Sequence, residues 1–270
     1  AREYSNEIDH ELAIPEQIVQ LAVAFRDRLT TLISHWLRVG YCQGNFNSDN
    51  CDCGGYTLDY GPFGFVERFD PYYQPWTGGG QHFSFFNQGA AAETNFDMFC
   101  KALQPLLSSA PEALDELNQI NLGFACVMQD KMEKMWASKL GLASYDPQLF
   151  EQLITLMVQT SVDYTIFFRE LSKIPDDISD LSKSFYNTPT DALSEQWVQW
   201  LQNWRSLLNT DDGIQRTAQM MQQVNPKYTW REWLVVPAYQ QAGKGDFELV
   251  HELQQVLTQP FNEQSSEIES

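Results

Sequence analysis

The chain has 270 residues, of which 43% are hydrophobic and 13% aromatic, so it can bury a substantial core. Its 17 basic and 36 acidic side chains give a formal charge of −19, which argues against nucleic acid and anionic membrane surfaces as partners because both attract clustered Lys and Arg. No run approaches the roughly 18 apolar residues of a membrane span, and five unevenly spaced cysteines predict no disulfide framework.

The first predicted element is a long helix over residues 16–39. Its apolar side chains recur at three- and four-residue steps, Pro15 suits a first turn, and Gly40 suits an end. Residues 41–89 then show no helical period. We predict loops there, with short strands around residues 56–58 and 83–86. A loop-rich stretch of this length in a compact chain usually carries function.

From residue 90 onward the pattern predicts helices almost to the end. They occupy residues 94–107, 113–140 (two helices), 147–172 after the cap Asp146, 194–208, 212–224, 228–242 and 247–257. Trp197, Trp200 and Trp204 share one face of the 194–208 helix, where we expect them to pack in the core. Pro237 is expected to kink or break its helix, and residues 261–270 to form a frayed tail.

The segment with chemical character lies within residues 40–65. Asp49 and Asn50 precede Asp59 by ten and nine residues, so a turn, a short hairpin and a second turn could bring the three side chains together. Oxygen ligands of this kind suit Mg²⁺ or Mn²⁺, which would hold nucleotide phosphates, and a free carboxylate beside them could accept a hydroxyl proton. Clusters of Asn, Asp and Gly also make ordinary turns, and this alternative stays open.

Other motifs fit known sites less well. An EF-hand starting at Asn45 would need glycine where Asn50 stands. Cys42, Cys51 and Cys53 have no second Cys pair, so we interpret them as ordinary thiols. The glycines at 78–80 lack the Lys and Ser/Thr of a phosphate-binding loop, and we interpret them as a flexible loop that covers the site.

The strongest signal is a resemblance. The stretches Asn47-Ser48-Asp49-Asn50 and Thr57-Leu58-Asp59-Tyr60-Gly61-Pro62-Phe63-Gly64-Phe65 resemble the signature of the selenoprotein O (YdiU) family. The similarity continues through residues 67–71, 82–88, 225–228 and 245–247, and so covers most of the chain. It implies a kinase-like fold and AMP transfer from ATP to Ser, Thr or Tyr hydroxyls of protein substrates.

Carried over to this sequence, the resemblance makes Asp49 the proton acceptor. It makes Asn50 and Asp59 the ligands of Mg²⁺ or Mn²⁺, with Asp59 also near ATP. The resemblance places members of the family in mitochondria in eukaryotes and in the cytoplasm in bacteria. Gln43 stands where the family usually has His, and residues 1–48 contain no glycine-rich loop with an ATP-pairing Lys.

We therefore expect a mainly α protein: a kinase-like C-lobe over residues 1–110, with a loop and short-strand catalytic segment, and a helical extension over 111–270. The expected function is that of the C-terminal portion of a protein adenylyltransferase without its ATP-binding lobe. Alone, this chain should bind ATP weakly or not at all, because one metal-bearing loop leaves the base and triphosphate unsupported. The alternative is a non-catalytic, pseudokinase-like helical module that binds a protein partner.

Overall fold

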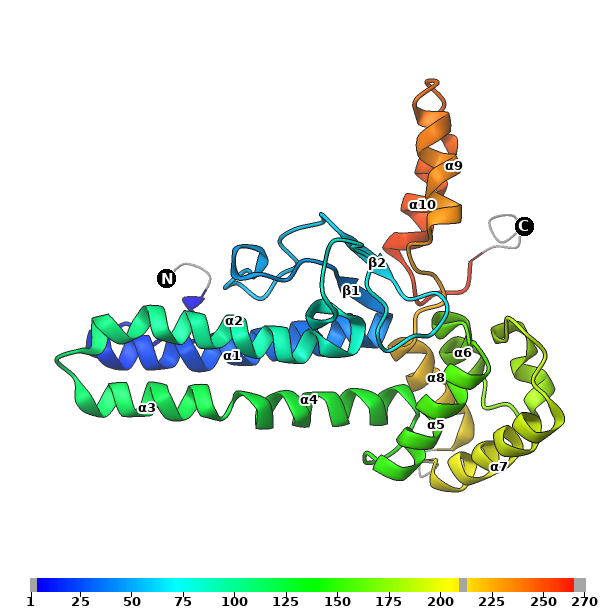
Figure 1. The fold of residues 1–270 in the computed structure, drawn as a ribbon, viewed down its shortest axis with the longest axis horizontal. Helices are drawn as coiled ribbons and strands as arrows, with labels where there is room; N and C mark the ends of the chain where they lie inside the picture. Colours follow the sequence, from blue (N-terminus) through cyan, green and yellow to red (C-terminus); the bar gives the residue numbers. More distant parts are fainter. Residues whose placement is uncertain (1–3, 209–212, 265–270) are drawn as a thin grey trace. The chain divides into compact units, whose positions relative to one another are not determined.

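The computed structural model describes residues 4–208 and 213–264 and is mainly helical, as the sequence predicts (Figure 1). The α-helices of the described residues are α1 Ile14–Val39, α2 Gln88–Leu103, α3 Pro111–Leu122, α4 Phe124–Lys139, α5 Pro147–Gln159, α6 Tyr164–Leu171, α7 Asp191–Leu207, α8 Ile214–Val224, α9 Glu232–Ala242 and α10 Glu248–Thr258. Two short strands, β1 Tyr41–Gln43 and β2 Phe63–Phe65, pair with each other. The 3-10 helices are η2 Ser48–Asn50, η3 Gln81–Phe83, η4 Phe85–Asn87, η5 Gln104–Leu107 and η6 Ile178–Ser184.

The predicted strand around residues 83–86 is wrong. Phe83 and Phe85 are buried as strand residues would be, but the backbone closes local turns, with the Ser84 N–H donating to the Gln81 carbonyl at 2.9 Å. The predicted strand at 56–58 is reduced to a single antiparallel bridge between Cys51 and Thr57. The aromatic residues of these two stretches favour buried strands, but tightly packed turns bury aromatic residues in the same way.

The predicted helix over 147–172 is two helices, α5 and α6. Asp163 begins the second one, because its carboxylate accepts a hydrogen bond from the Ile166 N–H at 2.9 Å. The other cap, Asp146, accepts from the Leu149 N–H at 2.8 Å as expected. α9 starts at Glu232 and continues through Pro237, so the proline does not divide it.

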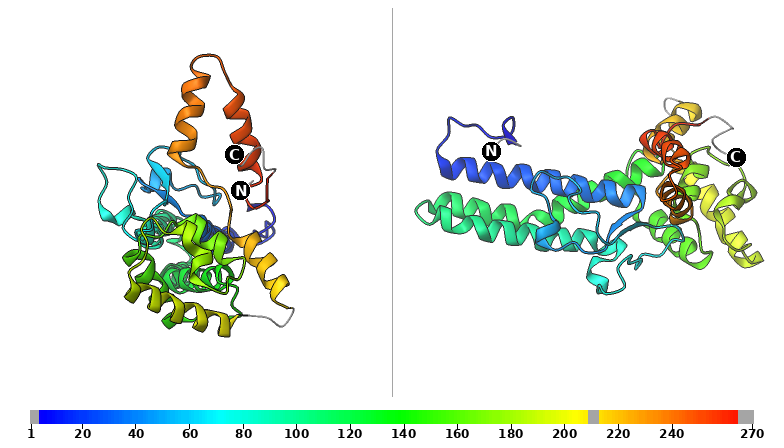
Figure 2. Two further views of the ribbon diagram at one scale, coloured as in Figure 1. Left: turned by 90° about the vertical axis from the view of Figure 1, so that its right-hand side faces the viewer. Right: turned by 90° about the horizontal axis from the view of Figure 1, so that it is seen from above.

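The chain forms two compact units. Unit 1 comprises the described residues of Ala1–Leu37, Cys42–Phe63 and Pro71–Glu133. Its core lies between α1 and α2, which run side by side (Figures 1 and 2), and is closed by α3 and the first part of α4. The Phe25 ring contacts Phe96 and Phe99 at centroid distances of 5.8 and 4.7 Å, and Phe124 packs on Phe96 at 5.2 Å.

Unit 2 comprises the described residues of Arg38–Tyr41, Gly64–Asp70 and Lys134–Ser270. The α7 tryptophans Trp197, Trp200 and Trp204 are all buried, as the amphipathic pattern predicts, and Trp200 and Trp204 stack at 5.9 Å. Hydrogen bonds fix two of these rings, because the Trp200 indole donates to the Leu149 carbonyl and the Trp204 indole to the Leu140 carbonyl.

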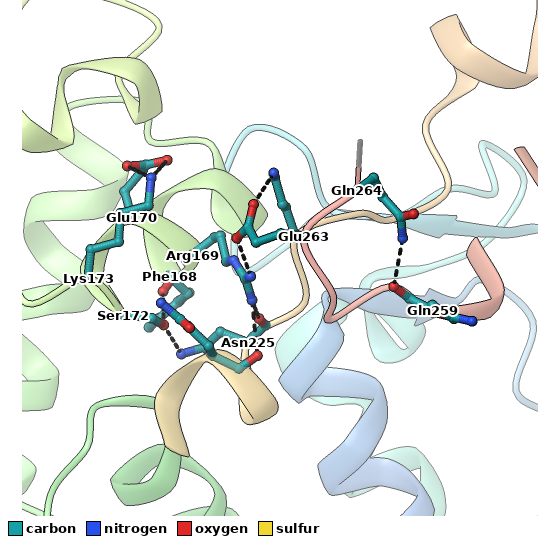
Figure 3. A network of polar contacts seen from close by, with 11 residues as sticks. Phe168, Arg169, Glu170, Ser172, Lys173, Asn225, Gln259, Glu263 and Gln264 are labelled. Carbon is teal, nitrogen blue, oxygen red and sulfur yellow. Dashed lines mark hydrogen bonds and ion pairs between the residues drawn. The ribbon is translucent and has the colours of Figure 1, made fainter. Parts of the chain in front are cut away.

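A polar network ties α6 to the end of the described chain within unit 2 (Figure 3). The Arg169 guanidinium donates to the Asn225 carbonyl at 3.1 Å and forms an ion pair with Glu263 at 2.7 Å. The Asn225 amide donates to Ser172 Oγ at 3.0 Å. The predicted frayed tail is therefore anchored at Glu263, and its residues 265–270 lie outside the described part.

None of the helices in the described residues combines the length and apolar character that crossing a membrane requires.

Candidate functional site

Residues 45–61, which contain the predicted catalytic side chains, are held against α1 in unit 1. The Trp36 indole N–H donates to Thr57 Oγ1 at 2.9 Å, and its ring meets Phe46 edge-on at 5.0 Å. About two helical turns closer to the N-terminus of α1, Arg28 donates to the Gly54 carbonyl at 3.2 Å. The Tyr4 hydroxyl donates to the neighbouring Cys53 carbonyl. These contacts fix both arms of the segment, so its polar side chains project from a supported backbone.

Gly44 closes the segment against the turn that follows Asp59. Its N–H donates to the Pro62 carbonyl at 2.6 Å, and a Cβ on Gly44 would lie only 2.4 Å from that oxygen. No side chain fits this approach, so glycine is required here for steric reasons. Gln43 precedes it and is buried, with its N–H donating to Gln88 Oε1 at 2.8 Å.

Asp49 and Asn50 occupy the single 3-10 turn η2. Asp49 is exposed, and its carboxylate accepts no hydrogen bond from the described residues. Asn50 is half-buried, and its amide N–H donates to the Asn45 carbonyl at 2.9 Å. This bond fixes the amide orientation, so the Oδ1 atom of Asn50 remains as the acceptor that a hard cation requires.

Asp59 lies in a turn of its own. Its Oδ1 accepts the Gly61 N–H at 3.0 Å, and a Cβ on Gly61 would come within 3.0 Å of Oδ2. Glycine at 61 therefore leaves the second carboxylate oxygen uncovered. The same kind of turn occurs at Asp52, whose Oδ1 accepts the Gly54 N–H at 2.9 Å.

The Cys51–Thr57 bridge joins the two arms that contain the predicted metal ligands. Asp49 and Asp59 each lie two residues from this bridge, on opposite arms. Asn50 shares its turn with Asp49, whereas no hydrogen bond in the described part links Asp59 to either of them. Within the described ranges no three His, Cys, Asp or Glu side chains gather as a metal site. The two predicted ligands, Asn50 and Asp59, differ in kind from such a cluster because one of them is an amide, and amide and carboxylate oxygens suit Mg²⁺ or Mn²⁺.

A cavity of about 580 Å³ opens beside Asp49 in unit 1. One wall is residues 46–49 and another is the exposed face of α2, including Thr94 and Met98. Sequence reasoning did not connect α2 with the site, because its residues follow the motif by about forty positions. A usable signal was the run of small and polar residues on this helix, which leaves room over its surface.

The cysteines near the segment differ in environment. Cys42 is buried, and desolvation raises the pKa of its thiol to about 12. Cys51 is half-buried and Cys53 is exposed. A raised pKa keeps the Cys42 thiol protonated at neutral pH, which makes it a poor nucleophile and a poor metal ligand.

The sequence of this chain matches the family described as protein adenylyltransferase SelO, and the match extends over residues 4–258. The chain belongs to this family. The SelO match includes all three predicted site residues, the segment that supports them and most of both units of the fold.

Curated relatives agree with the SelO assignment. The protein nucleotidyltransferase YdiU of Aromatoleum aromaticum is 33% identical over 249 residues, which are 88% of this chain and 47% of the relative. The protein of the same name from Rhodopirellula baltica is 31% identical over 294 residues, covering 96% of this chain and 53% of the relative. The chain thus spans about half the length of these relatives.

Proposed function

We propose that this chain carries the catalytic segment of a protein adenylyltransferase, which transfers AMP from ATP to hydroxyl groups of proteins. The observation that carries the proposal is Asp49. In a chain that belongs to the SelO family, this carboxylate has no hydrogen-bond partner among the described residues and lines a cavity large enough for a ligand.

In the proposed reaction, an acceptor hydroxyl oxygen forms a bond to the α-phosphorus of ATP. The bond from that phosphorus to the bridging oxygen breaks, and pyrophosphate leaves. The hydroxyl proton passes to the Asp49 carboxylate, which orients the nucleophile. Asn50 and Asp59 would hold a Mg²⁺ or Mn²⁺ ion that neutralises phosphate charge.

We propose that the chain has the two parts expected from the sequence. Residues 1–110 would provide the kinase-like catalytic segment and residues 111–270 a helical extension, with the nucleotide-binding lobe outside these 270 residues. The test must therefore supply that lobe. A suitable protein is a chimera in which this chain replaces the matched segment of the Aromatoleum aromaticum relative.

The test uses α-labelled ATP and compares Asp59→Asn with Asp52→Asn in the chimera. Both aspartates accept an N–H from the glycine two residues later, and asparagine can keep that turn. We expect AMP transfer by the wild-type chimera, a loss of about 100-fold or more in Asp59→Asn, and near-normal transfer in Asp52→Asn. Equal labelling by both variants would contradict the role of Asp59.

The second candidate is a non-catalytic helical module that binds a protein partner. A wild-type chimera that folds, binds ATP and transfers no AMP would support this candidate against the enzyme.

A further inference from the structure

The cavity beside Asp49 is lined along one side by α2, and we call it the trough. The lining residues from this helix are Ala90, Ala91, Thr94, Asn95 and Met98. They recur at spacings of one, three and four residues and so share one face, which extends for about 12 Å along the helix axis. A trough of this length fits three to four residues of an extended peptide.

The floor of the trough is apolar and rigid. Phe46 and Phe83 are 1% and 6% exposed, and both line it. Asn95 joins two of its sides, because its buried amide donates to the Phe46 carbonyl at 2.9 Å. Met98 is 51% exposed and adds a flexible apolar surface. An apolar side chain placed here would therefore lose water on several sides at once.

The charge of the lining favours a neutral or basic occupant over a triphosphate. Asp49 is its one carboxylate, and neither Lys nor Arg is among the described residues that line it. The polar side chains of the lining include His82 and the amides of Asn47, Asn87 and Asn95. They can hydrogen-bond a peptide, whereas the several negative charges of a triphosphate find no Lys or Arg among the described lining residues as counter-charge and face the Asp49 carboxylate. The formal charge of −19 on the whole chain adds a field that attracts basic segments.

We propose that this trough binds the acceptor segment of the substrate protein. Its hydroxyl-bearing residue lies against Asp49, an adjacent apolar side chain packs on the Phe46 and Phe83 floor, and basic residues flank the pair. The inference rests on the proposed function, because that function is what requires a hydroxyl at Asp49. It adds the substrate class: basic segments in which a hydroxyl residue neighbours a large apolar one.

The test is a binding measurement on the 270-residue chain without ATP or metal. The probe is a fluorescein-labelled peptide, Gly-Arg-Ser-Phe-Arg-Gly, followed by anisotropy. Thr94→Trp fills the trough from an exposed helix position, and Glu93→Trp is the matched control because Glu93 is exposed on the same helix but does not line the trough. Circular dichroism checks that both fold, and Ala90→Trp, also an exposed lining position, replaces Thr94→Trp if that variant does not.

We expect Thr94→Trp to raise the dissociation constant about tenfold or more while Glu93→Trp leaves it unchanged. The same peptide with Glu in place of Arg should bind at least tenfold more weakly. The proposal is overturned by no binding to the wild-type chain, by equal binding of all three proteins, by equal loss in both variants, or by equal binding of the acidic peptide. Because ATP is absent, a failure of AMP transfer in the chimera leaves this result unaffected, and the two proposals fail separately.

Discussion

Lys139 is buried near the end of α4 and donates hydrogen bonds to two neutral oxygens. Its Nζ atom lies 2.8 Å from the Arg38 carbonyl and 2.8 Å from Asn225 Oδ1, and 3.9 Å from the centre of the Phe168 ring. The described residues provide no ion-pair partner for it. Burial therefore lowers the pKa of Lys139 well below its usual value of 10.5, and the nearby Arg38 charge adds to this.

The buried amine makes stability depend on pH. Below its lowered pKa, folded and unfolded chains both hold the proton; between that pKa and 10.5 only the unfolded chain does, so this group makes the folded state more stable as pH rises. We expect the free energy of unfolding of the wild type, minus that of Lys139→Met, to rise through this window by up to about 1.4 kcal/mol per pH unit. Urea unfolding at several pH values measures it.

The control for this experiment is Lys183→Met, which removes an exposed lysine from η6. Tyrosines and cysteines that titrate in the same pH range contribute equally to the free energy of unfolding of each protein. Their contribution therefore cancels in the difference between wild type and variant. A difference for Lys139→Met that stays constant with pH would show that the amine is not buried as described.

The five thiols should differ in reactivity. Cys42 and Cys100 are buried, and desolvation raises the pKa of each to about 12, whereas Cys126 is exposed on α4. Since the thiolate is the reactive form, iodoacetamide at about pH 8 should label Cys126 in the folded protein and reach Cys42 and Cys100 only after denaturation. Peptide mass mapping identifies the labelled sites, and early labelling of Cys42 would contradict its burial.

At the scale of elements, the start of α6 combines a helix cap with a buried ion pair. Arg231 donates to both carboxylate oxygens of Asp163 at 2.8 Å, and their side chains are 9% and 5% exposed. The Tyr186 hydroxyl lies 3.0 Å from Asp163 and from Glu67. Residues from three separate stretches of unit 2 therefore meet at one helix N-terminus.

Asp163→Ala should destabilise the protein by about 3–5 kcal/mol, because it leaves the buried Arg231 charge with Glu67 alone, at 3.5 Å. Asp146→Ala is the matched control: it removes the equivalent cap of α5 without an ion pair and should cost about 1 kcal/mol. Adding Arg231→Leu to Asp163→Ala should recover part of the loss, since no uncompensated charge then remains. Urea denaturation measures all three, and similar costs for the two single variants would contradict this interpretation.

The sequence predicted most helices because their apolar residues recur with the helical period. It singled out Asp49, Asn50 and Asp59 through their oxygen donors and spacing, and a family resemblance supplied their expected roles. It did not predict strands β1 and β2, since three residues are too few to show an alternating pattern. The cap at Asp163 was missed although an acidic residue before a helical run is a usable signal. The trough on α2 and the supports from Arg28 and Trp36 depend on tertiary contacts, which local patterns do not encode.

At the scale of the whole molecule, 36 acidic side chains against 17 basic ones make self-repulsion a general cost of folding. Raising NaCl from about 20 to about 300 mM shortens the range of this repulsion, so the melting temperature should rise, by about 2–4 °C for each kcal/mol gained. Differential scanning calorimetry measures it. NaCl is preferred to sulfate, which strengthens burial in any protein, and a melting temperature that falls with NaCl would show that attractive pairs dominate.

Glu263 has a practical consequence for anyone who produces this protein. Its carboxylate is the counter-charge of Arg169, a guanidinium that is only 5% exposed, and it also pairs with Lys227. Trimming the recombinant chain ahead of this position would remove the counter-charge of a guanidinium held in the interior and should lower the stability of the fold. Shortened versions meant for crystallisation should therefore keep residue 263, and an affinity tag belongs downstream of it.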